Sequence, residues 1–318
     1  MPPNYLKLYQ EGTLQKKAEM LFKALRDCDI CPRNCRVNRL DNALGFCKTA
    51  KFAKVYSYFS HYGEEPAISG KNGSGTIFFS HCNLRCLYCQ NYEFSQQGKG
   101  REVDEEELAS IMLKLQEEGC HNINFVTPTH VIPQILKALL LAVPRGLNIP
   151  LVYNSSGYDS LSSLRLLDGI FDIYLPDARY ADTGIAQKYS QAKDYPRINQ
   201  TALKEMHRQV GVAQLNGEEI IVKGLIIRHL VLPGHLSGSA KIMDFIANEL
   251  GCDTYISLMS QYFPCYKAKD YPELSRRLTR EEYLEAMDIM HSYGLHNGWV
   301  QDEQGLDRFA GINIKANL

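Results

Sequence analysis

The chain has 318 residues, of which 45% are hydrophobic, and its formal net charge is −1. This length is enough for one or two domains with a sizeable core. The near-neutral charge argues against nucleic acid or an anionic membrane surface as the main partner. The first twenty residues lack the apolar run of a secretory signal, and no stretch approaches 18 apolar residues. We therefore expect a cytoplasmic protein without a membrane span.

Cysteine is distributed unevenly along the chain, which contains ten such residues. In a reducing cytoplasm, clustered cysteines indicate metal sites or catalytic thiols rather than disulfides. Seven of the ten fall in two groups, the first being Cys28, Cys31, Cys35 and Cys47, and the second Cys82, Cys86 and Cys89.

The first part of the chain predicts a helical lead-in over residues 1 to about 27, with Leu21, Phe22 and Leu25 as its apolar stripe. The segment that follows is rich in Arg, Asn and Gly, which is typical of loops held by a metal. We therefore divide the chain into residues 1–52, a helical lead-in with a four-cysteine metal-binding segment, and residues 53–318, a larger domain.

Strand and helix patterns alternate from Gly75 onward. The helix predicted between residues 103 and 119 is the clearest, because Asp104 can cap it with Glu107 three residues later. A second capping box, Thr279 with Glu282, predicts the start of the last helix. The predicted strands cover residues 75–80, 122–126, 149–154, 171–175, 224–232 and 255–259, and each is followed by helical sequence.

Six strand–helix units predict an α/β fold with a parallel sheet and helices outside. Because six units are too few for the usual closed eight-stranded barrel, we expect an open, partial (β/α)6 TIM-like barrel. In such folds the chemistry lies at the carboxyl ends of the strands. The residues at or just beyond predicted strand ends are Cys82, Thr127, Asn154, Asp177, the segment after Arg228, and Gln261.

The spacing C-x3-C-x2-C of Cys82, Cys86 and Cys89 follows the first of these strands. Iron–sulfur cubanes use four thiolates as a rule, so three thiolates leave one iron without a protein ligand. An open coordination position is typical of a catalytic metal rather than a structural one. The alternative is a zinc loop, but zinc prefers four closed ligands and no other cysteine lies near in sequence.

This array, with the aromatic Tyr88 just before Cys89, resembles the signature of the radical S-adenosylmethionine (SAM) superfamily. The resemblance implies a [4Fe-4S] cluster with SAM bound at the open iron. It also implies that the reduced cluster passes an electron to the sulfonium, and that the 5′-deoxyadenosyl radical so formed abstracts a hydrogen atom. The cofactors carry this chemistry, while the protein orients them and excludes water.

The chain further resembles homologues of pyruvate formate-lyase activating enzyme. The strings that carry this resemblance include "GEEPAISG", "DIYLPDARY", "IRHLVLPGH" and "SLMSQYFPCYKA". It implies an oxidoreductase that activates a glycyl-radical enzyme, with a glycyl-radical enzyme or another protein as its substrate. The alternative within the superfamily is a maturase or biosynthetic enzyme that acts on another peptide or a small molecule.

The resemblance also implies residues that contact SAM. The segment after the second strand lacks the Gly-Gly-Glu sequence that binds the SAM amino group in the superfamily, but the hydroxyls of Thr127 and Thr129 can accept hydrogen bonds there. Thr129 is equally well explained as a helix cap. Asn154 matches a ribose or methionine contact, or a turn. Arg228 matches a carboxylate-binding arginine, or a structural ion pair. Asp177 would order the site or touch substrate.

The spacing C-x2-C-x3-C-x11-C of the first cysteine group supplies four thiolates, which is enough to close a metal site. A structural zinc and a second iron–sulfur cluster both fit, and this choice stays open. A second cluster would feed electrons to the first. The basic residues of this segment would attract an acidic electron donor such as flavodoxin or a ferredoxin. A function of another class, a zinc-stabilised non-catalytic binding module, would place zinc at both cysteine groups.

Overall fold

The computed structural model of the chain describes residues 2–301. Within this range, seven strands pair in parallel in the order in which they occur in the sequence. The first six confirm the predicted strands, whereas the seventh, β10, was not predicted. These strands are β2 (Ser74–Phe79), β4 (Ile123–Val126), β5 (Leu151–Asn154), β6 (Ile173–Tyr174), β8 (Ile221–Leu230), β9 (Tyr255–Met259) and β10 (Gly298–Val300).

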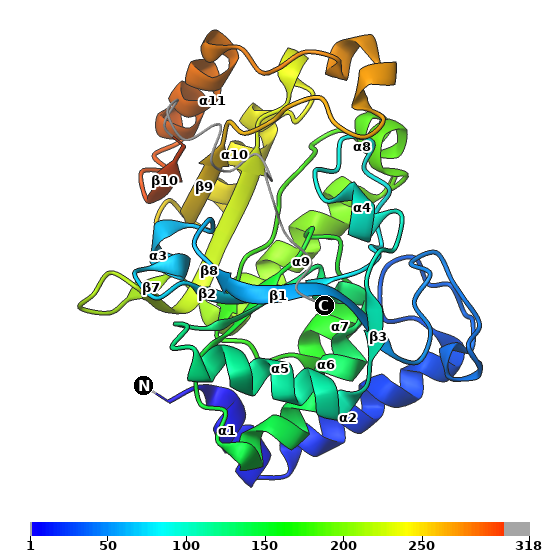
Figure 1. The fold of residues 1–318 in the computed structure, drawn as a ribbon. Helices are drawn as coiled ribbons and strands as arrows, with labels where there is room; N and C mark the ends of the chain where they lie inside the picture. The colour runs from blue at the N-terminus through cyan, green and yellow to red at the C-terminus, as the bar shows by residue number, and fades with distance from the viewer. Residues whose placement is uncertain (1, 302–318) are drawn as a thin grey trace.

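Three further strands of the described residues pair with their neighbours in antiparallel orientation. The long strand β1 (Ala53–His61) runs alongside β2 and crosses the front of the molecule in Figure 1. It also pairs with β3 (Arg101–Val103), and β7 (Gln214–Leu215) pairs with β8. In the described residues β3 and β10 form the two edges of the sheet, so the barrel is open, as the sequence predicts.

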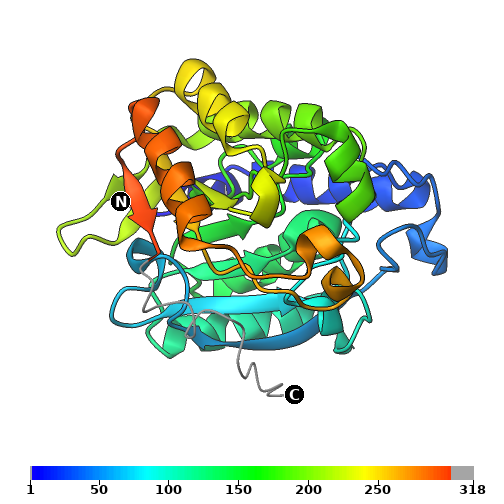
Figure 2. The same cartoon turned by 90° about the horizontal axis from the view of Figure 1, so that it is seen from above.

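Most of the helices lie on the outside of the curved sheet (Figures 1 and 2). Both predicted capping arrangements are present: the Asp104 side chain accepts a hydrogen bond from the Glu107 N–H at 2.8 Å, and Thr279 and Glu282 cap each other. None of the helices in residues 2–301 is both long and apolar enough to cross a bilayer. The outer helices are α5 (Glu105–Glu117), α6 (Ile132–Ala142), α7 (Leu161–Leu166), α8 (Thr183–Ser190), α9 (Tyr195–Val210), α10 (Ser239–Glu249) and α11 (Arg280–Ser292).

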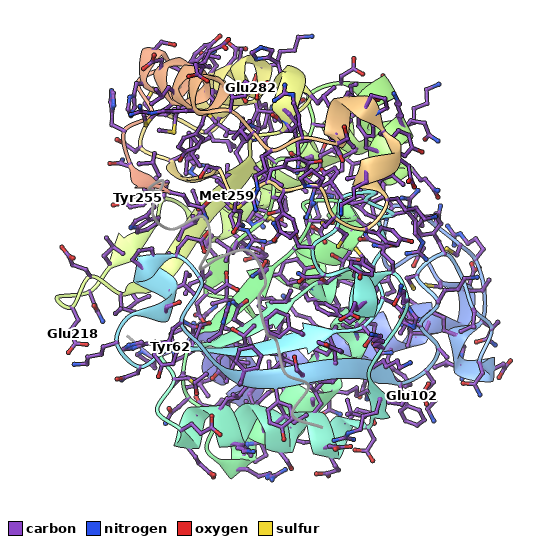
Figure 3. All side chains as sticks on the ribbon, turned by 45° about the horizontal axis from the view of Figure 1, so that its top comes forward. Tyr62, Glu102, Glu218, Tyr255, Met259 and Glu282 are labelled. Atoms are coloured by element: carbon purple, nitrogen blue, oxygen red, sulfur yellow. The ribbon has the colours of Figure 1, made fainter. Side chains whose placement is uncertain are left out.

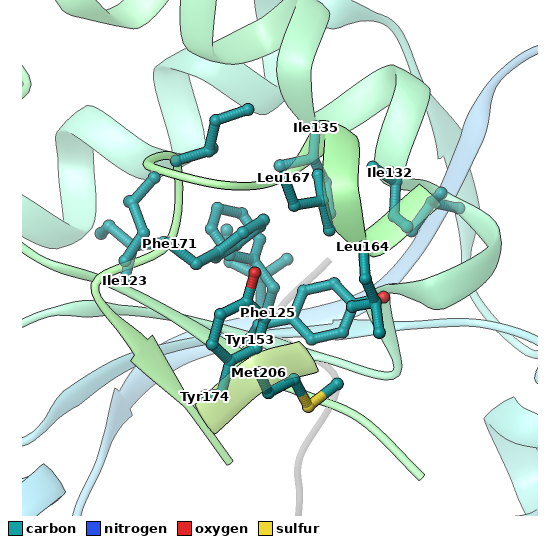
Figure 4. Packing of buried hydrophobic residues seen from close by; sticks show 14 of the residues in the cluster. Ile123, Phe125, Ile132, Ile135, Tyr153, Leu164, Leu167, Phe171, Tyr174 and Met206 are labelled. Carbon is teal, nitrogen blue, oxygen red and sulfur yellow. The ribbon is translucent and has the colours of Figure 1, made fainter. Parts of the chain in front are cut away.

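The main core lies between the strands and the outer helices (Figure 4). Phe125 and Tyr153 point from β4 and β5 into this layer, where Leu164 of α7 and Met206 of α9 meet them. The N-terminal helices α1 (Asn4–Gln10) and α2 (Thr13–Ala24) contribute buried side chains to the same core, and α2 packs on α6. The division of the chain at residue 52 stays a prediction.

The opposite, inner face of the strands is covered near their amino ends by the short helix α3 (Pro66–Ser69). Its residues Ala67 and Ile68 are buried against Val152 of β5 and Ile226 of β8. Because α3 occupies the inside of the open barrel, the two glutamates that precede it, Glu64 and Glu65, are carried into the interior.

Candidate active site

The cysteine loop begins directly after β2 and leads into α4 (Tyr92–Ser95). Cys82 and Cys86 are buried and Cys89 is half-buried. Burial raises the pKa of the Cys82 thiol to about 12, and the neighbouring thiols of Cys86 and Cys89 add to this rise. All three cysteines lie on the one loop between β2 and α4.

Hydrogen-bond donors surround the three sulfur atoms. The Ser190 hydroxyl lies 3.0 Å from Cys86 Sγ, and the Nη1 of Arg179 lies 3.8 Å from the same atom. Donors of this kind stabilise thiolate ligands and tune the reduction potential of a cluster. Cys82 Sγ accepts from the Leu84 N–H at 3.3 Å and lies 3.8 Å from Asn83 Oδ1, and the Ser95 hydroxyl lies 3.1 Å from Cys89 Sγ.

The chemistry of this donor set fits an iron–sulfur cluster with one open corner: three thiols on one loop, each with a hydrogen-bond partner at its sulfur. Across residues 2–301, no group of three or more His, Cys, Asp or Glu side chains is placed to hold a single metal ion.

An aromatic shell encloses the cysteine loop. The hydroxyls of Tyr88 and Tyr180 are 2.5 Å apart, and Tyr180 also contacts the Ser190 hydroxyl at 2.7 Å. The edge of the Tyr262 ring meets Tyr88, with 5.8 Å between the ring centroids. Because these tyrosines are buried and their hydroxyls are paired, they exclude water from the loop without leaving polar groups unsatisfied.

The segment after β9 covers the cysteine loop from outside. Cys265 donates a hydrogen bond from its thiol to the Tyr88 carbonyl at 3.2 Å, and the Tyr266 ring stacks on Tyr92 with centroids 5.0 Å apart. Burial raises the pKa of Cys265 to about 12. A thiol that follows the last predicted strand thus lies beside the predicted catalytic loop.

The N-terminal cysteine segment is docked on the cysteine loop. Arg33 donates a hydrogen bond from Nε to the Asn83 carbonyl at 2.8 Å, and its guanidinium lies 3.8 Å from the centre of the Phe46 ring. The guanidinium of Arg85, from the cysteine loop, also lies over Phe46, at 4.5 Å. Two cations therefore share one aromatic ring at the contact between the two cysteine segments.

The four N-terminal cysteines lie on one segment between α2 and β1. Cys28, Cys31 and Cys47 are buried and Cys35 is half-buried. Burial raises the pKa of Cys31, and the thiols of Cys47, Cys28 and Cys35 add to this rise. A side chain at Gly45 would place a Cβ only 2.8 Å from the Cys35 Cβ, so glycine permits this close approach.

Three of the predicted SAM-binding residues meet in the barrel interior. Arg228 of β8 donates from Nη2 to the Asn154 side-chain oxygen at 2.7 Å, and its Nε lies 3.0 Å from Asp177 Oδ1. These residues come from the carboxyl ends of β5, β6 and β8, where the alternation of strands and helices predicts convergence. The arginine is therefore part of an ion pair, one of the two roles considered for it.

Three members of this charged network, Arg179, Glu64 and Glu65, were missed by sequence reasoning. Arg179 pairs with Asp177 and so links the network to Cys86. Glu64 lies 3.5 Å from Arg228 Nη1 and accepts hydrogen bonds from the side-chain amides of Asn124 and Asn154, at 3.1 and 3.4 Å. The burial of Glu64 could have been suspected from the "GEEPAISG" string, because its two adjacent glutamates are followed by small and apolar residues.

The two predicted threonines are placed differently from this network. Thr127 adopts a left-handed conformation, with a φ of 62°, directly after β4. Thr129 is buried, and its hydroxyl donates to Asp159 at 2.7 Å, as do the hydroxyls of Tyr153 and Ser155 at 2.8 and 2.7 Å. Thr129 therefore neither caps a helix nor joins the charged network, and its predicted contact with SAM has no geometric support.

Two cavities adjoin at Arg228, Met259 and Gln261. The loop cavity, of about 150 Å³, borders Cys89 and Tyr88. Figure 3 shows Met259 towards the middle of the molecule and Tyr255, at the start of the same strand, nearer its edge. The glutamate cavity, of about 220 Å³, is lined by Gly63, Glu64, Glu65, Pro66, Arg228, Ser257, Met259, Gln261, Trp299, Val300 and Gln301.

A third cavity, of about 460 Å³, borders neither the cysteine loop nor Arg228. It is lined by Lys71, His121, Glu218 and other residues near α3. We place the site at the two smaller cavities because the thiols and the charged network lie there.

The sequence profile of the Radical SAM superfamily matches residues 76–175, which include the three loop cysteines, Asn154 and most of the parallel strands. The chain belongs to the radical SAM superfamily. Membership implies a [4Fe-4S] cluster and SAM as cofactors, and the residues of the cysteine loop fit that cluster.

This radical SAM protein is also 34% identical to the "Uncharacterized protein MJ0674" of Methanocaldococcus jannaschii over 302 residues, which cover 92% of this chain and 82% of the relative. A second protein of that organism, "Uncharacterized protein MJ0808", is 24% identical over 88% of this chain and 86% of its own.

A solved structure shares the fold of this chain at low sequence identity. The FeFe-hydrogenase maturase HydG from Carboxydothermus hydrogenoformans superposes with a TM-score of 0.51 at 13% identity, covering 74% of this chain and 56% of that one. Methylornithine synthase (PylB) covers 96% of this chain and 82% of its own, with a TM-score of 0.46 at 13% identity. This radical SAM protein thus spans just over half the length of the HydG chain, and the likeness extends to the fold alone.

Proposed function

We propose that this protein cleaves SAM reductively at a [4Fe-4S] cluster held by Cys82, Cys86 and Cys89, and uses the product for hydrogen abstraction. The observation that carries the proposal is the placement of three thiols on one loop after β2, each sulfur with a hydrogen-bond partner. When bound, the reduced cluster would supply one electron to the sulfonium of SAM, whose C5′–S bond would break to give methionine and a 5′-deoxyadenosyl radical for hydrogen abstraction.

The residues of this chain prepare the site for that chemistry. Ser190 and Arg179 donate towards Cys86 and so stabilise its thiolate. Tyr88, Asp177 and Arg228 line the loop cavity, which we assign to the end of SAM that meets the cluster, because its volume of about 150 Å³ holds only part of that molecule. The Arg228 guanidinium is held by its partners in one orientation, which is what a carboxylate-binding arginine requires.

The N-terminal thiols support a second metal centre, either a second [4Fe-4S] cluster or zinc. Cys28, Cys31, Cys35 and Cys47 gather within one segment, and Arg33 ties that segment to the cysteine loop. A redox-active centre there would pass electrons from an external donor to the catalytic cluster. Radical SAM enzymes usually take these electrons from flavodoxin or a ferredoxin, and we propose the same for this protein.

For the target, the sequence resemblance supports activation of a glycyl-radical enzyme. A second candidate, a maturase or biosynthetic enzyme acting on another peptide or a small molecule, is favoured by the glutamate cavity. That cavity is small, charged and next to the loop cavity, so it suits one defined chemical group.

The deciding experiment is incubation of oxygen-free, reconstituted protein with dithionite and SAM, followed by chromatography for 5′-deoxyadenosine. We expect this product from the wild type and none from the Cys82→Ala variant. Wild-type protein that carries its full iron and sulfide but forms no 5′-deoxyadenosine would refute the proposal. A glycyl radical detected by electron paramagnetic resonance in a co-purified partner would select the activase role.

A further inference from the structure

Two adjacent carboxylates reach the barrel interior from the loop between β1 and α3. The Glu64 side chain is 9% exposed, and Glu65 as a whole is 8% exposed. Burial raises the pKa of both carboxyl groups above the usual value, and the nearby positive charge of Arg228 opposes this rise without cancelling it. Glutamates are rarely buried to this degree without a partner of opposite charge.

The charges in the interior network do not balance. Its carboxylates are those of Glu64, Glu65 and Asp177, and its guanidiniums are those of Arg228 and Arg179. Arg228 is shared among all three carboxylates, while Arg179 pairs with Asp177 alone. A buried charge without compensation is costly, so one more positive group would stabilise this arrangement.

The two glutamates differ in their hydrogen bonds. Glu64 Oε1 accepts from Asn124 and Asn154, and its other oxygen faces Arg228. In contrast, the buried Glu65 Oε2 has no partner within hydrogen-bonding distance among residues 2–301, although the Ser257 hydroxyl is near enough to this carboxyl group to lower its pKa. Glu65 lines the glutamate cavity. A ligand donor in that cavity would satisfy an oxygen that is otherwise costly to bury.

The remaining walls of the glutamate cavity suit an alkylammonium group. Met259 and Trp299 offer apolar surface for a methylene chain, and an indole ring also attracts a cation. Ser257 and Gln261 add polar groups at the same wall. A carboxylate or phosphate in this cavity would meet Arg228 but would also be repelled by two glutamates, Glu64 and Glu65. The volume of about 220 Å³ is below that of a typical drug-sized site, so it fits one small molecule or the end of a larger one.

We propose that the glutamate cavity binds the primary ammonium group of the substrate, with Glu65 as its acceptor. This inference rests on the proposed function, because it places that substrate beside the loop cavity that we assign to SAM. The two cavities share Arg228, Met259 and Gln261, so a carbon chain anchored at Glu65 extends towards the cysteine loop. The ammonium belongs either to a small amine or to a lysine side chain.

Trp299 is the only tryptophan in the chain and reports on this cavity by its fluorescence. The test titrates anaerobically reconstituted protein with n-butylamine, which is cationic at pH 7.5, and with butanol and butyrate of matched length. We expect saturable binding of butylammonium only. Nα-acetyl-lysine amide separates the two sources: tighter binding than butylammonium assigns a lysine side chain, and weaker binding assigns a small amine.

The Glu65→Gln variant keeps the shape of the side chain and removes its charge. We expect it to raise the Kd for butylammonium by at least about tenfold, while SAM binding and 5′-deoxyadenosine formation with dithionite stay measurable. Glu218→Gln is the matched control, because Glu218 lines another cavity that Trp299 also borders, and it should leave the Kd unchanged.

The proposal is overturned if Glu65→Gln binds butylammonium as tightly as the wild type. It is also overturned if butyrate or butanol binds the wild type as well as butylammonium does, a comparison that needs no variant and so holds even if Glu65→Gln does not fold. Loss of 5′-deoxyadenosine formation in the wild type would instead contradict the proposed function. The two failures are therefore distinguishable.

Discussion

Arg33 donates a hydrogen bond from Nε to the carbonyl oxygen of Asn83, 2.8 Å away, and this bond joins the two cysteine segments of the protein. Arg33 lies between Cys31 and Cys35, and Asn83 lies directly after Cys82. A change at either segment is therefore transmitted to the other through a short, charge-assisted contact.

Replacement of Arg33 by alanine should destabilise the contact between the N-terminal cysteine segment and the cysteine loop. The variant loses the bond to Asn83, a second bond to the Gln191 carbonyl and the contact with Phe46. We expect the free energy of unfolding to fall by about 2 kcal/mol, measured by urea denaturation of anaerobic protein. Arg36→Ala is the control in the same segment: its ion pair with Asp27 is half-exposed and should cost at most about 1 kcal/mol. Equal losses in the two variants would contradict the docking role.

Replacement of the three loop cysteines should show whether the protein has two independent metal centres. The triple Cys82/Cys86/Cys89→Ala variant should lose about four irons and the matching sulfide, while the metal at the N-terminal cysteines is retained. Metal and sulfide analysis after anaerobic purification measures both. Cys252→Ala, at an exposed cysteine, should leave the content unchanged. Loss of all metal from the triple variant would contradict the assignment of two separate sites.

Arg179 should raise the reduction potential of the catalytic cluster. Its guanidinium lies 3.8 Å from Cys86 Sγ, and a positive charge stabilises the reduced, more negative state. We therefore expect Arg179→Gln to lower the midpoint potential in a titration followed by electron paramagnetic resonance. Arg208→Gln, an exposed arginine paired with Asp168 and Glu205, serves as control. A potential that is unchanged or higher in Arg179→Gln would show that the guanidinium does not act on the cluster.

Glu282 should stabilise the protein in a pH-dependent way. Its hydrogen bonds from Arg276, together with those from the backbone of Thr279 and Gly234, lower its pKa from 4.5 to about 2. Because the folded state favours the carboxylate, this contribution is complete above pH 4.5 and is lost as the pH falls towards 2.

We expect Glu282→Gln to reduce the free energy of unfolding by about 1 kcal/mol at pH 7. The difference from the wild type should shrink as the pH is lowered below 4.5, which thermal denaturation at several pH values would reveal. Glu281→Gln, in the same helical turn, is the matched control. If the difference in free energy of unfolding between the wild type and Glu282→Gln did not change with pH, the charge of Glu282 would not contribute to stability.

The sequence alone determined those elements whose stabilising contacts join residues close together in the chain. The Asp104 and Thr279 caps bond to residues three positions away, and both could be predicted because their partners are fixed by helix geometry. The three loop thiols span eight residues, so their convergence was predictable from spacing alone. Likewise, Asn154, Asp177 and Arg228 were placed together because parallel strands end at one edge of a sheet.

Tertiary structure alone decided the features whose partners are distant in sequence. Strand β1 became antiparallel to β2, and β10 joined β9, because a strand pattern does not specify which neighbour it pairs with. Glu64 reaches Arg228 across 164 positions only because α3 folds back into the open barrel. Thr129 bonds to Asp159 instead of joining the charged network around Arg228. Local sequence sets where a strand ends, whereas tertiary packing decides which way each side chain beyond that end faces.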